Sequence, residues 1–255
     1  MLRQYGGGAV TLSRPQGSGV ARLQLDHPER RNAMSGAMMV QLLEAVEELE
    51  AWGEGVGLLL TGAANPRGVF CSGGDLRTIE VGLKDSDAGF QMATLMGEAT
   101  RRLRALPLVS VCALEGAAVG GGAELATATD YRVAAAGASL AFVQARMGVA
   151  PGWGGGGRLV ELVGRRAALD LLLTCRKVGA EEGLALGLVD QVVEGEAVGA
   201  AEKWLEERVG GGRAPEVVRA LKAMVTGEGE EARHFAPLWG GEANRKALAS
   251  HIKHR

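Results

Sequence analysis

A run of three glycines between an apolar segment and a helical one constrains this chain more than any other feature. Residues 108–114, Leu-Val-Ser-Val-Cys-Ala-Leu, predict a buried strand, and residues 123–128 have the composition of a buried helix. Gly120, Gly121 and Gly122 therefore lie at a strand-to-helix turn, where the missing side chains let a ligand approach the backbone. The free N–H groups and the dipole at a helix start favour negative charge. We therefore expect this turn to hold a phosphate, or an oxyanion that forms during a reaction.

Strands and helices alternate along most of the chain, which predicts an α/β core. We expect this core over residues 9–195, disorder over residues 1–8 and a helical cap over residues 196–255. Apolar runs and alternating patterns predict strands at residues 9–14, 19–26, 56–60, 108–114, 131–134, 140–144 and 189–193. Helices are expected after Ser35 and at residues 92–106, 158–163, 165–175, 180–187, 196–208, 215–225 and about 229–251. The polar residues 78–90 are expected to be mobile.

Charge and cysteine content exclude several classes of protein. The 255 residues carry 28 basic and 30 acidic side chains, and this net charge of -2 argues against nucleic acid as the main partner. Cys71, Cys112 and Cys175 form an odd, scattered set without metal-ligand spacing, which fits a reduced intracellular compartment. The longest apolar stretch, near residues 105–123, is interrupted by proline, glutamate and glycine, so we predict no membrane span. The first residues lack the apolar core of a signal peptide, and we expect a cytosolic protein.

Two further glycine-rich segments extend the argument from the first. Residues 69–76, Val-Phe-Cys-Ser-Gly-Gly-Asp-Leu, follow a predicted strand, and residues 147–157 precede a predicted helix. If the turns at residues 73–74 and 120–121 aim backbone N–H groups at one point, they form an oxyanion hole, in which each donor contributes roughly 3 kcal/mol. The alternative is that these glycines only permit tight turns. A dinucleotide site is disfavoured, because residues 116–122 do not follow the Gly-x-Gly-x-x-Gly pattern of a first βαβ unit.

Five motifs, in the same order, carry a resemblance to a known family. They are His27-Pro…Asn32-Ala, residues 70–76, residues 116–125, residues 148–155 (Gly-Val-Ala-Pro-Gly-Trp-Gly-Gly) and residues 180–190. Over about residues 10–255 the chain resembles the enoyl-CoA hydratase/isomerase (crotonase) family. The resemblance implies a fold of repeated ββα superhelical turns with a C-terminal helical region for trimerisation, and hence a homotrimer or a dimer of trimers. It also implies an acyl-CoA substrate, with no metal and with no cofactor apart from the coenzyme A of the substrate itself.

The resemblance also assigns roles to individual residues. It implies that the backbone N–H groups of Gly74 and Gly121 are the two oxyanion donors. The residues that it places along coenzyme A or around the acyl group are Arg30, Arg31, Ser72, Asp75, Leu76, Trp153 and Lys253. Arg30 and Arg31 can also be plain surface charges, and a tryptophan such as Trp153 can equally belong to the core.

Two positions for acid–base residues separate the reactions of the family. Its hydratases place two glutamates across one water; the first position falls on Glu124 and the second, counted back from Gly148, falls on Gln144. Because a neutral amide cannot act as a general base, hydration and isomerisation are disfavoured. A gap before Gly148 would place Arg146 at the second position, and an arginine cannot serve as that base either.

Several segments resemble those family members that decarboxylate ethylmalonyl-CoA. They are Trp153 in Pro-Gly-Trp-Gly-Gly, residues 38–39, residues 41–44, residues 142–147 and residues 238–244. This resemblance implies decarboxylation of ethylmalonyl-CoA to butyryl-CoA, and of methylmalonyl-CoA to propionyl-CoA, through an enolate. It further implies a clean-up role for side products of fatty-acid synthesis. The alternatives are hydration or isomerisation of enoyl-CoA, and a non-catalytic acyl-CoA-binding scaffold.

Glu124 and Gln144 receive specific roles in the decarboxylation hypothesis. We expect Glu124 to be protonated, since burial and a nearby substrate carboxylate both disfavour a second negative charge. It would then donate a hydrogen bond or the final proton, whereas the alternative is an acid held at a helix start by the dipole. Gln144 would donate a hydrogen bond to the leaving carboxylate, or merely fill the position.

Overall fold

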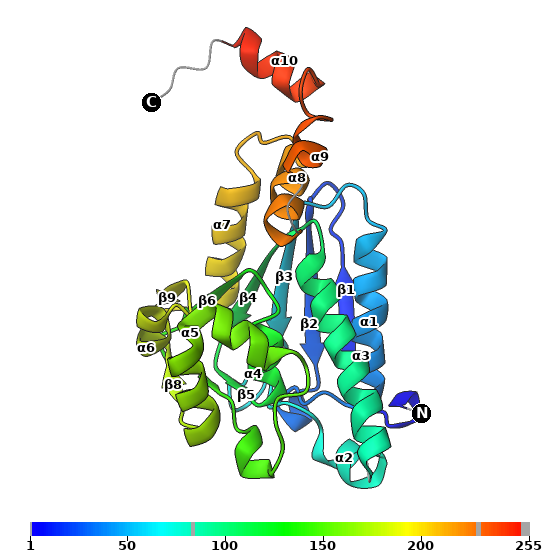
Figure 1. Cartoon of the computed structure of the whole chain (residues 1–255), viewed down its shortest axis with the longest axis vertical. Coiled ribbons are helices and arrows are strands. Elements are labelled where there is room, and N and C mark those ends of the chain that lie inside the picture. The colour runs from blue at the N-terminus through cyan, green and yellow to red at the C-terminus, as the bar shows by residue number, and fades with distance from the viewer. Residues whose placement is uncertain (1, 83–84, 228–230, 251–255) are drawn as a thin grey trace.

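The computed structural model describes residues 2–82, 85–227 and 231–250, in which helices surround two sheets (Figure 1). The larger sheet has the strand order β1-β2-β3-β4-β6-β9. Its strands are β1 (Ala9–Ser13), β2 (Val20–Asp26), β3 (Gly57–Gly62), β4 (Val109–Leu114), β6 (Tyr131–Ala135) and β9 (Gln191–Val193). β1 pairs with β2 in antiparallel fashion, and all other neighbours in this sheet are parallel. The predicted α/β class is confirmed.

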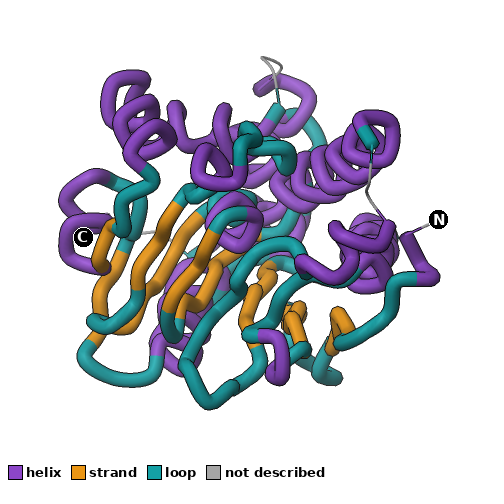
Figure 2. Tube along the Cα trace, turned by 90° about the horizontal axis from the view of Figure 1, so that it is seen from below, coloured by secondary structure: helices purple, strands orange, loops and turns teal. Residues whose placement is uncertain are grey.

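Helices cover both faces of the larger sheet, and the pattern of β3 shows why. Leu58 and Leu60 belong to the core under α1 (Gly36–Glu50) and α3 (Ser86–Ala105), whereas Leu59 faces a second core under α7 (Ala197–Val209). A strand that is buried on both faces has no polar alternation, which explains the continuous apolar run in the sequence. Figure 2 shows the strands lying between the two groups of helices.

A smaller sheet continues the chain beyond β4. It consists of β5 (Ala117–Val119), β7 (Ser139–Ala141) and β8 (Val178–Gly179), in the order β5-β7-β8. The crossing from β4 to β5 is tight, since a Cβ built on Gly116 would lie 1.5 Å from the carbonyl oxygen of Gly68. After β5 the chain enters α4 (Gly121–Ala126), the helix that the sequence places after the glycine turn.

The remaining helices lie around this framework. They are α2 (Leu76–Gly82), α5 (Gly155–Thr174), α6 (Ala180–Leu186), α8 (Pro215–Thr226), α9 (Glu231–Phe235) and α10 (Glu242–Ala249), with turns of 3-10 helix at Leu2–Gln4, Pro28–Arg30 and Gln144–Met147. Gly164 interrupts α5 with non-helical backbone angles, where the sequence predicts the end of a helix. α10 projects away from the sheets beyond α9 (Figure 1). Within the described ranges, none of the helices has the length and apolar character that a membrane crossing requires.

The first described residues pack against α1, while the disorder expected for residues 1–8 stays a prediction. Residues 2–4 form a helical turn in which Leu2 is buried, and the carbonyl oxygen of Tyr5 accepts a hydrogen bond of 3.0 Å from the N–H of Ala37. This packing depends on Gly36, because a Cβ there would lie 2.4 Å from the Leu2 carbonyl oxygen. Packing against α1 compensates for the flexible composition of the segment, and no local pattern reveals it.

Two helices have bounds that differ from the predicted ones. α3 begins at Ser86 instead of about residue 92, because the side chain of Asp85 caps it by accepting a bond of 2.8 Å from the N–H of Ala88. The expected helix over residues 229–251 is divided into α9 and α10 by a turn at residues 236–241. The division into a core over residues 9–195 and a cap over residues 196–255 stays a prediction, although α7 packs directly on the larger sheet.

A buried ion pair attaches α8 to this sheet and yields a test of the fold. Lys222 of α8 is 4% exposed, pairs with Asp130 and donates a bond of 3.0 Å to the carbonyl oxygen of Arg104. We expect Lys222→Ala to lower the free energy of unfolding by about 2 kcal/mol, because it leaves the Asp130 carboxylate partly buried without its cation. Urea denaturation measures this change. Lys246→Ala, which removes the exposed pair with Glu242, is the matched control and should have no measurable effect on the free energy of unfolding. Equal losses in the two variants would contradict a stabilising role of the buried pair.

Candidate active site

The two glycine turns singled out in the sequence lie against each other. Backbone bonds join Phe70 and Cys71 to Ala117 of β5, and the N–H of Val119 donates to the carbonyl oxygen of Cys71 at 2.9 Å. A Cβ built on Gly73, where φ is +96°, would lie 2.9 Å from the Val119 carbonyl oxygen and 3.2 Å from the backbone nitrogen of Gly121. The contact between the turns therefore requires a residue without a side chain at position 73.

Each turn presents a backbone N–H group that is free to bind a ligand. Within the described part of the chain, no acceptor is bonded to the N–H of Gly74 or of Gly121. The neighbours of both groups are fixed: Met34 bonds to Gly73 and Asp75 at 2.8 and 2.9 Å, and the N–H of Gly120 donates to Ala141 at 2.8 Å. Two unbonded donors on touching, immobilised turns can serve one ligand oxygen, which is the requirement for an oxyanion hole.

The Glu124 side chain lies at the start of α4 and joins three segments. It is 2% exposed, and its Oε1 accepts a bond of 2.7 Å from Nε2 of Gln144. Its Oε2 accepts bonds from the backbone N–H groups of Trp153 and Gly155 at 2.8 and 2.9 Å. Three N–H donors are the partners that an ionised carboxylate prefers. The protonated form expected from the sequence requires the Gln144 amide to rotate by half a turn, so that its oxygen accepts the proton of the acid.

Gln144 carries a buried polar atom that lacks a partner. The residue is 8% exposed, and no donor among the described residues reaches its Oε1. Leaving a buried acceptor unpaired costs about 1–3 kcal/mol, so this atom marks a place where a ligand, a water or a rotated amide changes the bonding. Arg146 is exposed, so Gln144 and not Arg146 is the residue beside Glu124.

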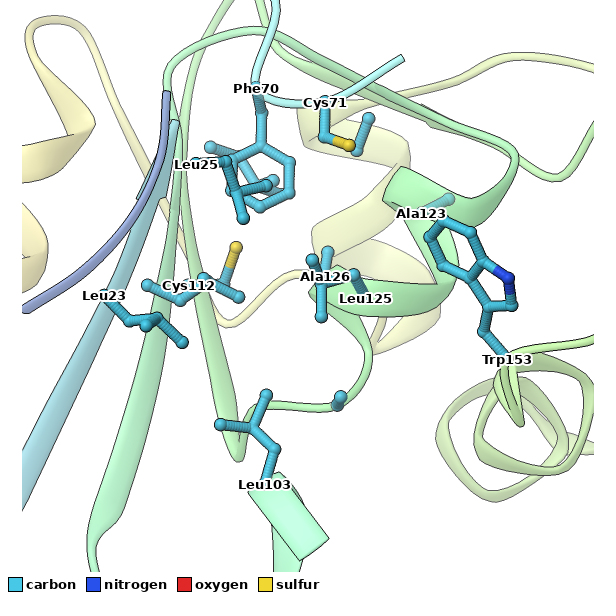
Figure 3. Packing of buried hydrophobic residues seen from close by; sticks show 14 of the residues in the cluster. Leu23, Leu25, Phe70, Cys71, Leu103, Cys112, Ala123, Leu125, Ala126 and Trp153 are labelled. Carbon is cyan, nitrogen blue, oxygen red and sulfur yellow. The ribbon is translucent and has the colours of Figure 1, made fainter. Parts of the chain in front are cut away.

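The indole of Trp153 covers the start of α4. Trp153 is 4% exposed, and a Cβ built on Gly121 would lie 2.4 Å from its ring. Figure 3 shows this ring beside Ala123 of α4. The indole therefore occupies the space that a side chain at position 121 would fill, next to one of the two free N–H groups.

Arg158, in the first turn of α5, is a residue of the site that the sequence analysis missed. It is 7% exposed, and its Nη2 donates bonds of 2.8 Å to the backbone carbonyl oxygens of both Glu124 and Trp153. Burial lowers the pKa of Arg158 to about 10 and the Glu124 charge opposes that shift, so the guanidinium stays charged at neutral pH. A cation in the first turn of a helix opposes the dipole, and this is the one signal that the sequence offered.

Cys71 adjoins the site but is not a nucleophile. Burial raises the pKa of its thiol to about 12, and a hydrogen bond from the Gly73 backbone only partly offsets this effect. A thiol with such a pKa carries essentially no thiolate at neutral pH.

The residues expected along coenzyme A cluster beside the turn at residues 73–74. The backbone N–H of Ser72 donates to the Arg31 carbonyl oxygen at 3.1 Å, and Ser72 Oγ donates to that of Arg30 at 3.2 Å. Leu76 is 54% exposed at the start of α2, whereas Asp75 is buried and accepts a bond of 3.3 Å from the N–H of Arg77.

A cavity adjoins this group of residues. It has a volume of about 340 Å³, and its lining includes Arg30, Asp75 and His27. Nη2 of Arg30 is a buried atom without a partner among the described residues. Lys253 lies outside the described residues. The structure thus brings Arg30, Arg31, Ser72, Asp75 and Leu76 together, and their roles stay predictions.

A larger cavity, of about 590 Å³, lies on the other side of Arg158, between α5, α7 and α8. Its lining includes none of the residues of the two glycine turns. The cations Lys222 and Arg104 in this lining are paired with Asp130 and Glu161. The glycine turns, with their free N–H groups and buried carboxylate, are therefore the better candidate for a reaction site.

Comparisons with known proteins agree with this geometry. The sequence profile described as enoyl-CoA hydratase/isomerase matches residues 15–236. Ethylmalonyl-CoA decarboxylase of Danio rerio is 43% identical over 269 residues, covering 100% of this chain and 87% of its own length. The protein of the same name from Homo sapiens is 39% identical over 261 residues, covering 97% and 83%.

Solved structures show the same fold. An enoyl-CoA hydratase from Bacillus anthracis superposes with a TM-score of 0.82 at 25% identity, covering 94% of this chain and 95% of its own. Pseudomonas aeruginosa DspI gives a TM-score of 0.83 at 30% identity, covering 96% of each chain. The expected crotonase fold is therefore confirmed. Because the family profile spans most of the sequence and full-length relatives share about two fifths of its residues, the chain belongs to the enoyl-CoA hydratase/isomerase family.

Proposed function

We propose that this enzyme decarboxylates ethylmalonyl-CoA to butyryl-CoA, and methylmalonyl-CoA to propionyl-CoA. One observation carries the choice between reactions: Gln144, a neutral amide, bonds to Glu124 where a hydratase of this type needs a second acid. The relatives named ethylmalonyl-CoA decarboxylase support the same choice. Since an amide cannot activate water as a base, the site is better suited to a reaction that needs no second acid.

The two glycine turns supply the central step of the proposed mechanism. The thioester carbonyl oxygen accepts the N–H groups of Gly74 and Gly121. The carboxylate is held out of the plane of that carbonyl, so the bond between C2 and the carboxylate breaks and CO2 leaves. The electron pair of the broken bond passes into the enolate, whose oxygen carries the charge that the two N–H groups stabilise by roughly 3 kcal/mol each. The thioester is itself the electron sink, and the proposed reaction needs no resident cofactor or metal.

Glu124 and Gln144 complete the proposed reaction by handling the carboxylate and the proton. When the substrate carboxylate enters, a second negative charge beside Glu124 favours the protonated acid. Rotation of the Gln144 amide then gives its unpaired oxygen a partner and turns its NH2 group toward the substrate carboxylate. After CO2 has left, the proton of Glu124 moves to C2 of the enolate and yields the saturated thioester. Trp153 walls the acyl group against Gly121 and limits the size of the branch.

The assembly and location of the enzyme belong to the same proposal. We place the coenzyme A moiety along Arg30, Arg31, Ser72, Asp75 and Leu76, with Lys253 near a phosphate. We propose a homotrimer or a dimer of trimers, which the exposed apolar side chains of α8, α9, α10 and the turn before α10 support; they are Leu221, Val225, Phe235, Trp239 and Leu248. Three buried free cysteines suit the reducing environment of the cytosol. There we propose a clean-up role for side products of fatty-acid synthesis.

Release of CO2 from ethylmalonyl-CoA by the purified protein tests the proposed function. We expect CO2 and butyryl-CoA in equal amounts, one deuterium at C2 when the reaction runs in D2O, and no hydration of crotonyl-CoA. Hydration without CO2 release would contradict the proposal and imply that another group supplies the missing base. Binding of butyryl-CoA with neither reaction would instead favour the acyl-CoA-binding scaffold.

Replacing Gln144 by glutamate tests the role of the amide. We expect Gln144→Glu to slow CO2 release about 100-fold, because it puts a like charge against the substrate carboxylate. The same variant should acquire measurable crotonyl-CoA hydration, since two acids then face one water. Gln144→Met, which removes the amide without adding charge, is the control and should not hydrate crotonyl-CoA. A Gln144→Glu enzyme that decarboxylates at the original rate would exclude contact between residue 144 and the carboxylate.

A further inference from the structure

We propose that Arg158 is a positioning residue that fixes Trp153 against Gly121 and fixes Glu124 beside it. In its kinetic part this inference rests on the proposed decarboxylation, whereas its structural part does not. Arg158 sits behind the site, where it bonds to the backbone of Glu124 and Trp153 and not to their side chains.

The residues around Arg158 pack closely against its guanidinium and satisfy its hydrogen-bond donors. Gly154, with φ of +78°, lies beside the guanidinium, and a Cβ at position 154 would be only 2.6 Å from Nη1. A buried guanidinium is tolerated only when its donors are satisfied. Here each of its three nitrogens has an acceptor: Nε bonds to Thr127 at 3.1 Å, Nη1 bonds to Thr100 at 3.3 Å, and Nη2 bonds to the two carbonyl oxygens.

These bonds hold the two peptide groups on either side of the Trp153 Cα atom. The N–H of Trp153 donates to the Glu124 carboxylate, and its carbonyl oxygen accepts bonds from Arg158 Nη2 and, at 2.7 Å, from Thr100 Oγ1. Without Arg158 the carbonyl group would lose a charged donor, and the backbone on both sides of Trp153 could rotate and carry its N–H away from Glu124. The indole would then leave Gly121, and Glu124 would lose one of its three N–H donors.

The shape of the guanidinium is essential to this role. It joins Thr100 of α3, Thr127 at the end of α4 and the carbonyl oxygen of Trp153 through donors that point in different directions within one plane. A lysine ammonium is a point charge on a flexible stem and cannot span the same acceptors. Arg158→Lys therefore keeps the charge but removes the fixed geometry.

Fluorine NMR of protein labelled with 5-fluorotryptophan tests the structural part directly. The chain has four tryptophans, and the Trp153 resonance is assigned by its loss in Trp153→Phe. We expect Arg158→Lys to shift or broaden the Trp153 resonance and to leave those of Trp52 and Trp239 in place. Thr100→Val, which removes the hydroxyl that donates to the Trp153 carbonyl oxygen, should shift the same resonance, and it decides the question if Arg158→Lys does not fold.

Arg132→Lys is the matched control. Arg132 is also buried, at 1% exposure, and donates to the backbone of Leu188 and Thr129 and to Asp190. It follows Tyr131, whose ring contacts Trp204, so this variant is expected to disturb the Trp204 resonance and not that of Trp153. General destabilisation would shift the Trp153 resonance in both Arg158→Lys and Arg132→Lys. Loss of positioning would shift it only in Arg158→Lys.

Kinetics supply the second readout. We expect Arg158→Lys to lower kcat for CO2 release about 100-fold with little change in KM, because a small displacement of reacting groups slows the chemical step while the coenzyme A contacts lie elsewhere. An unmoved Trp153 resonance in both Arg158→Lys and Thr100→Val, or an equal shift in Arg132→Lys, would overturn the inference. If the original protein releases no CO2, the proposed function fails while the NMR result still decides the role of Arg158.

Discussion

The close approach of the Gly73 and Gly121 backbones is the contact on which the rest of the site depends. A Cβ at position 73 would lie 2.9 Å from the Val119 carbonyl oxygen, and one at position 122 would lie 2.2 Å from the Cys71 carbonyl oxygen, so the two segments meet only because both positions lack a side chain. The pairing of residues 70–71 with β5 brings the turns together, and the tight crossing at Gly116 leads from β4 of the larger sheet to β5 of the smaller one. Sheet geometry thus brings two turns with free N–H groups into contact, and no side chain is needed to create the oxyanion hole that we propose.

Around this contact, a buried network makes the site rigid. Glu124 accepts three N–H groups, one of them from Trp153, and Arg158 bonds to the carbonyl oxygens of both residues. The charged guanidinium and the carboxylate therefore bond to the two adjacent peptide groups that flank the Trp153 Cα atom. Gln144 Oε1 is the one atom of this network left without a partner in the described residues, and it is the natural place for the network to change when a substrate binds.

The sequence predicted the glycine turns that form the backbone of the site, but not most of the side-chain contacts that hold them in place. Glycine runs after apolar strands located the turns at residues 73–74 and 120–121, since only glycine suits a close approach of two chains. The contact between Glu124 and Gln144 could be expected only from the resemblance to a family, because nothing local relates two residues that are twenty positions apart.

Arg158 escaped notice because its acceptors are carbonyl oxygens and hydroxyls from α3, α4 and the preceding loop, which fold together only in three dimensions. The contacts of residues 2–5 with α1 were not predicted for a similar reason: they come from packing of Leu2 and from a backbone bond between Tyr5 and Ala37, not from any propensity of the glycine-rich segment itself.

The central claim is that the N–H groups of Gly74 and Gly121 bind one thioester oxygen. Isotope-edited infrared spectroscopy of bound butyryl-CoA measures this interaction directly, because a ¹³C label at the thioester carbon isolates the stretching band of that carbonyl. Two backbone donors would polarise the carbonyl group, and the account predicts a band at lower frequency in the complex than in water. A band at the frequency found in water, or above it, would contradict the account.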